Sequence, residues 1–261
     1  MTRAHLRREA LTPVVVIGAL LAAVFLAPWP LASRLVGTPW DGPASLARAV
    51  SDALAHDWQS NAALPGAAGS ALAGPTRFWQ AFHLVRAILA GGLLAVSVRA
   101  ATRSWAPPAS TTDPGRPWGL VHSLSALACA GVALLLSVAN LQGAIAPLTS
   151  VLGFLPEAAA SGSDVAGAIR DALATGTRSP MADAIVTDFA RYHLALAVLG
   201  SLAATALSGG IAVAWRRKRV VEGLVLACAA AFFVIVVAAN IGTWLNPTPA
   251  LDAFLAGIPA R

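Results

Sequence analysis

Two histidines in this chain stand in nearly the same context, each between an aromatic residue and a leucine. The stretches are Phe82-His83-Leu84 and Tyr192-His193-Leu194, and each opens a long apolar run. Two imidazoles at one membrane depth on two helices are the axial ligands that a b-type haem requires. The pair is therefore a candidate site for haem b or a quinone, and the favoured alternative is a pair of interfacial anchors that bind no ligand.

Three further polar residues accompany the histidines. Arg86 lies one helical turn beyond His83, where it could meet a haem propionate or a quinone oxygen. Asn140 and Asn240 close two apolar runs, where asparagine caps a helix or bonds to a neighbouring one more often than it binds Na⁺ or a substrate. No catalytic residue is predicted, and no metal ligand apart from the two histidines if haem is bound, so a non-enzymatic protein is favoured.

The elements that must position these residues are transmembrane helices. Of 261 residues, 57% are hydrophobic and 11% are charged, whereas a soluble domain has about 25% charged residues. The mean hydropathy is +0.70, and the apolar residues form blocks. Five blocks are long enough to cross the bilayer core. They are Leu11–Trp29, Trp79–Val98, Leu120–Ala139, Tyr192–Ala214 and Val220–Ala239.

The net charge of +6 is explained by arginines that flank these blocks, which favours membrane orientation over nucleic-acid binding. The N-terminal segment, the loop of residues 99–116 and the turn Arg216–Arg219 are rich in basic residues, and Glu222 is one of the three acidic residues counted with them. The positive-inside rule places these regions, and with them the N-terminus, in the cytoplasm of a bacterial cell. The C-terminus is then extracytoplasmic. The first block could be a cleaved signal peptide, although a retained anchor is favoured.

The two long extracytoplasmic loops resemble one another. Leu46–Ala55 reads LARAVSDALA and Val165–Ala174 reads VAGAIRDALA, with six identical positions. Their apolar residues recur at helical spacing, so each segment is predicted to form a short amphipathic helix. Such a helix lies on the membrane surface or packs over the bundle.

Two more matches occur in the same order along the chain. Asn140 corresponds to Asn240 and Pro147 to Pro247 at a shift of 100 residues, and the histidine stretches correspond at a shift of 110. We therefore predict a parallel internal repeat within a single membrane domain of residues 1–261. The first copy covers about 11–101, the second about 118–215, and a partial third copy about 220–261.

The predicted fold class is an all-α integral protein of the plasma membrane, with five transmembrane helices, two short extracytoplasmic amphipathic helices and a parallel repeat. The favoured function is a non-enzymatic accessory or scaffold subunit at the cell envelope. Its expected partners are the lipid bilayer and a membrane protein or a second copy of the chain. Two alternatives stay open: an electron-transfer subunit that binds haem b or a quinone through His83 and His193, and a component of a small-solute permease.

Overall fold

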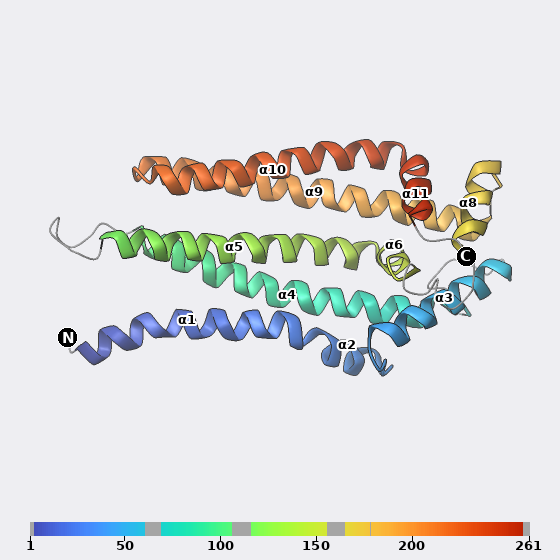
Figure 1. Cartoon of the computed structure of the whole chain (residues 1–261), viewed down its shortest axis with the longest axis horizontal. Coiled ribbons are helices and arrows are strands. Elements are labelled where there is room, and N and C mark those ends of the chain that lie inside the picture. The colour runs from blue at the N-terminus through green and yellow to red at the C-terminus, as the bar shows by residue number, and fades with distance from the viewer. Residues whose placement is uncertain (1–2, 61–68, 106–115, 156–164, 178, 258–261) are drawn as a thin grey trace. The chain divides into compact units, whose positions relative to one another are not determined.

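A computed structural model of the chain describes residues 3–60, 69–105, 116–155, 165–177 and 179–257, and over these residues it contains helices and no strand (Figure 1). The all-helical prediction is thus confirmed. The long helices are α1 (Arg3–Leu26), α4 (Ala73–Arg103), α5 (Arg116–Ile145), α9 (Pro180–Arg216) and α10 (Val220–Leu245). The short helices are α2 (Pro28–Val36), α3 (Pro43–Gln59), α6 (Pro147–Leu152), α8 (Val165–Thr175) and α11 (Pro247–Ala256).

Four helices are long and apolar enough to cross a membrane, namely α4, α5 from Gly119 onward, α9 and α10. A fifth candidate combines Val14–Leu26 of α1 with α2, which meet at a bend of 53°. The chain therefore has four or five segments that suit a multi-pass membrane protein. The first predicted span, Leu11–Trp29, falls on α1 and the start of α2, and the bend lies at Pro28, which lacks an N–H and whose ring clashes with the preceding turn.

Three of the long helices stop just before a proline, and a short helix starts at that proline. These prolines are Pro28 of α2, Pro147 of α6 and Pro247 of α11. The residues before the last two adopt similar extended conformations, with φ −125° and ψ 71° at Ala146 and φ −139° and ψ 75° at Asn246. The sequence analysis does not predict these short helices, although proline at the first position of a helix is a known start signal.

The asparagines do not end their helices, contrary to prediction. Helix α5 continues past Asn140 to Ile145, and α10 continues past Asn240 to Leu245. Each helix continues because the next strong helix breaker is the proline that follows it.

The chain divides into two compact units. Unit 1 comprises Met1–Pro28, Val85–Asn140 and Leu199–Val237, and unit 2 comprises Trp29–Leu84, Leu141–Val198 and Ala238–Arg261. The two predicted amphipathic helices are observed as α3 and α8, and both belong to unit 2.

Unit 2 contains a continuous apolar core. Leu46, Val50 and Leu54, the apolar stripe of α3, are fully buried in it, and Ile169 of α8 is fully buried as well. Helix α8 contacts both α3 and α11, and Figure 1 shows α8 beside α11. The amphipathic helices thus bury apolar residues of their predicted stripes in protein. Several aromatic side chains also pack against the core, namely Trp29, Trp40, Trp58, Trp79 and Phe82.

Unit 1 is packed mainly through small residues. Its buried side chains are mostly alanines, and large apolar side chains such as Ile88 and Ile235 are exposed on its helices, as expected for a surface that faces lipid. Gly200 of α9 lies against α10, where a Cβ would approach Val237 to 2.9 Å. Close helix contact in this unit therefore depends on the absence of side-chain volume rather than on large interlocking residues.

Candidate functional site

The ring of His83 lies directly over Gly143 of the neighbouring helix α5. A Cβ atom at position 143 would be 2.6 Å from His83 Nε2, so only glycine leaves room for the imidazole in this position. The same Nε2 atom is 2.8 Å from Ser150 Oγ in α6. His83 therefore connects α4 to the two elements that follow it in the chain.

Ser150 also binds the side chain of Trp79, one turn before His83 on α4. Trp79 Nε1 donates to Ser150 Oγ at 2.9 Å, and an indole N–H can only donate. The Ser150 hydroxyl can then donate to Nε2 of a neutral His83, so that one hydroxyl serves both rings. Edge contacts enclose the site further, with ring centroids of Trp79 4.8 Å from His83 and 4.7 Å from Phe154.

Helix α4 also satisfies the end of α5. The last carbonyls of a helix have no partner within it, and here Gln80 Nε2 donates to the carbonyl oxygen of Ala144 at 2.9 Å. Pro147 cannot supply the N–H that would continue the ladder of α5. Gln80 and His83 together thus hold the terminal turn of α5 against α4.

His193 makes the corresponding kind of contact from α9 to α10, with a different partner. Its Nδ1 atom donates to Asn240 Oδ1 at 2.6 Å, and the ring of Phe189 lies 4.6 Å from the imidazole, centroid to centroid. The backbone carbonyl of the adjacent Tyr192 accepts a hydrogen bond from Gln142 of α5 at 3.2 Å. His193 and Asn240 are both predicted site residues, and the structure brings these two together.

The remaining predicted site residues belong to unit 1. The guanidinium carbon of Arg86 lies 5.2 Å from the ring centroid of Phe25, a cation–π contact between α4 and α1. Asn140 is buried, and its Nδ2 donates to the carbonyl of Leu136 in its own helix at 2.7 Å. Both residues therefore contact helices of unit 1.

Asp57, which the sequence analysis does not nominate, is fully buried in unit 2. It accepts hydrogen bonds from Ser70 Oγ at 2.8 Å and from the backbone N–H groups of Ala71 at 3.0 Å and Leu72 at 3.1 Å, immediately before α4 begins. Burial by itself would raise the pKa of the Asp57 carboxyl, but these donors, which bind the charged form, hold the pKa below its usual value of 3.8. The carboxylate therefore fixes the entry to α4.

Asp188 of α9 plays a similar part for α6. It is buried, and its Oδ2 atom accepts from the backbone N–H of Thr149 at 2.7 Å, in the first turn of α6. A carboxylate is favourable at this end of a helix because it satisfies an unpaired N–H and faces the positive end of the helix dipole. No local motif marks Asp188, because its partner lies 39 residues earlier in the chain.

In this structure His83 makes its contacts with protein groups. Its Nε2 atom, the usual ligand atom, is bonded to Ser150, and the ring is held against Gly143. Where side chains are described, no group of three or more histidine, cysteine, aspartate and glutamate residues could hold a metal ion. No protein-family model, curated protein or solved structure matches this chain, so its function must follow from the contacts above.

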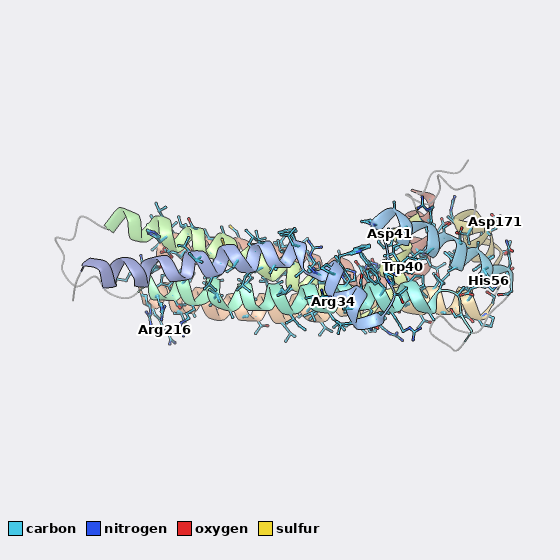
Figure 2. The ribbon with its side chains drawn as sticks, turned by 90° about the horizontal axis from the view of Figure 1, so that it is seen from below. Arg34, Trp40, Asp41, His56, Asp171 and Arg216 are labelled. Atoms are coloured by element: carbon cyan, nitrogen blue, oxygen red, sulfur yellow. The ribbon has the colours of Figure 1, made fainter. Side chains whose placement is uncertain are left out.

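A cleft of about 500 Å³ lies on the surface of unit 2. It is formed by α8 and α11, and its polar lining includes Arg170, Asp171, Asn246 and Asp252. Arg170 Nε donates to Asp252 Oδ1 at 3.0 Å, which joins the two helices, and both side chains are almost half exposed. Figure 2 shows the side chain of Asp171 on the outside of this region.

Proposed function

We propose that this chain is a non-enzymatic accessory or scaffold subunit of a membrane assembly, and that unit 2 carries the surface for its protein partner. One observation supports this most directly: several of the polar residues that could do chemistry serve as bonds between helices. His83, His193 and Asp188 each join two elements of unit 2. They stabilise a folded platform rather than converge on a vacant site.

The packing of unit 1 supports a scaffold over a permease. A route for a polar solute needs polar groups along the interior of the spans. The buried residues of unit 1 are mainly alanines, with a few serines and the polar side chains of Asn140 and Glu222. Such an interior suits close helix packing and offers few groups to replace the hydration shell of a solute.

The proposal includes the finer topology predicted from the sequence. We propose that the N-terminus is cytoplasmic and that unit 2 is extracytoplasmic. The basic residues support this orientation because Arg219 of the basic turn bonds to the carbonyl of Ser104, just after the end of α4. Two basic segments that are far apart in sequence thus lie on one side of unit 1. The matching backbone before Pro147 and Pro247 likewise supports the proposed parallel repeat.

Photo-crosslinking in native membranes tests the partner surface. A benzophenone amino acid at Asp171, on the α8–α11 cleft, is expected to give one discrete protein adduct at native expression. The same probe at Ile88, whose side chain is 73% exposed on a membrane-spanning segment of α4, is the matched control and should give lipid adducts. If position 171 yields no protein adduct, or if both positions give the same proteins, the scaffold proposal fails. A Soret band in the purified protein, lost in His193→Ala, would favour the haem alternative instead.

A further inference from the structure

The turn between α9 and α10 presents a compact basic surface. Helix α9 ends at Arg216, and Lys218 adopts a left-handed conformation with φ 57°. The chain reverses there through two backbone hydrogen bonds of 2.9 Å, from Lys218 N–H to the carbonyl of Trp215 and from Arg219 N–H to the carbonyl of Ala214. This closure resembles the usual end of a helix with a left-handed residue, and it leaves Arg216, Arg217 and Lys218 exposed.

A side-chain contact fixes this turn against α4. Arg219 Nη2 donates to the carbonyl of Ser104, which follows the last residue of α4. The last turns of α4 expose two more cations, Arg99 and Arg103. We name these five exposed residues the basic edge: Arg99, Arg103, Arg216, Arg217 and Lys218. Figure 2 shows Arg216 projecting outward from the ribbon.

The carboxylate of Glu222 does not neutralise the basic edge. Glu222 is the one acidic residue of unit 1 whose side chain the structure describes, and it is 2% exposed. Its Oε1 atom is 3.4 Å from Arg219 Nη1, one turn earlier on the chain. Residues 219 and 222 are three positions apart at the start of α10, so their side chains can meet on the same face of the helix. Among the described residues of unit 1, the carboxylate of Glu222 therefore pairs with the inner Arg219 rather than with the five exposed cations.

A tryptophan indicates that the basic edge lies at the level of lipid headgroups. Trp215 is 60% exposed, and a Cβ atom at Gly223 would lie 2.5 Å from its indole nitrogen. The ring thus rests on the glycine of α10 and stays beside the turn. Tryptophan at the end of a membrane-spanning helix prefers the headgroup region. A surface that combines this ring with five cations meets both the apolar and the anionic part of that region.

We propose that the basic edge binds the phosphate groups of anionic phospholipids and selects them over zwitterionic phospholipids. Each basic residue close to an anionic membrane surface contributes roughly a five-fold preference. The neighbouring apolar helices favour a lipid over a soluble anion, because the acyl chains can lie along the exposed side chains of α9 and α10. The assignment does not depend on the partner proposed for unit 2.

The test measures which lipids remain on the purified full chain. The protein is equilibrated in micelles with equal amounts of phosphatidylglycerol and phosphatidylcholine, and native mass spectrometry gives the ratio of the two lipids bound. The triple variant Arg216→Gln, Arg217→Gln, Lys218→Gln should lower this ratio by at least ten-fold. The control triple variant changes three exposed arginines of unit 2 to glutamine and should change the ratio less than two-fold. The control residues are Arg34, Arg48 and Arg77.

Two further measurements test whether the charge of the basic edge causes the preference for phosphatidylglycerol. Arg216→Lys with Arg217→Lys retains the charges and should retain the preference for phosphatidylglycerol, which separates lost charge from a damaged fold. Added NaCl should weaken the preference of the unmodified protein, because exposed charges are screened. If both triple variants lose the preference equally, the effect comes from net charge alone. If the variant with Arg216, Arg217 and Lys218 replaced keeps an unchanged ratio, the basic edge is not the lipid-binding site. Either result overturns the proposal.

Discussion

Replacing Gly143 by alanine is expected to lower the free energy of unfolding by about 1–3 kcal/mol, the usual cost of overpacking. Alanine is a better helix former than glycine, so helix propensity alone predicts the opposite sign. The loss is expected because the new Cβ would lie 2.6 Å from His83 Nε2. The imidazole would have to leave its position, and with it the bond to Ser150. Denaturation in mixed micelles, followed by circular dichroism, measures the change.

Gly131 provides the matched control in the same helix. It is exposed, and a Cβ there would meet nothing within 4 Å, so Gly131→Ala should be neutral or stabilise by about 0.5–1 kcal/mol. Combining Gly143→Ala with His83→Ala should remove the clash, so the double variant should be more stable than the two single changes predict. Strictly additive effects would show that the imidazole does not rest on Gly143.

The second large effect is expected for Asp57→Ala, with a loss of about 3 kcal/mol in the free energy of unfolding. The change removes a buried acceptor and leaves the N–H of Leu72 buried without its partner. The apparent melting temperature should fall by roughly 6–12 °C for a chain of this size. Asp52 lies on the same helix and is exposed, so Asp52→Ala should change stability by less than about 0.5 kcal/mol.

The same residue predicts a dependence on pH. The pKa of the Asp57 carboxyl lies below 3.8 in the folded protein, so its stabilising contribution is complete above the pKa of the unfolded chain. That contribution is lost as the pH falls through the folded pKa. The stability difference between the unmodified protein and Asp57→Asn should therefore be constant from about pH 5 to 8 and shrink below about pH 4. A difference that grows in acid would contradict the hydrogen-bonded carboxylate.

Local sequence patterns were enough to predict the long helices and the two amphipathic helices. The contacts that these helices make with one another could not be predicted from such patterns. The apolar stripe Leu46, Val50, Leu54 predicted α3 because helical periodicity is written in adjacent residues. The short helices α6 and α11 were not predicted because Pro147 and Pro247 were interpreted as corresponding positions of the repeat and not as first residues of helices. The contact of Trp79 with Ser150 was also not predictable, because the position of Trp79 at the edge of an apolar run does not reveal its hydrogen-bond partner.

For the candidate site, the residues could be predicted from the sequence but their hydrogen-bond partners could not. His83 and His193 were found from their matching contexts, and Asn240 from its position in an apolar run. Their bonds were not predictable, because His83 binds Ser150, 67 residues later, and His193 binds Asn240, 47 residues later. Sequence alone cannot tell an imidazole that awaits a ligand from one that already holds a neighbouring helix.

The histidine contacts also have a direction along the chain. His83 of α4 bonds to α6, and His193 of α9 bonds to α10, so each reaches forward to an element synthesised later. Each histidine is therefore synthesised before its hydrogen-bond partner, and Asn240 follows His193 by 47 residues. Assembly of unit 2 is in this sense vectorial. A chain truncated before α10 would present the His193 ring without its partner Asn240.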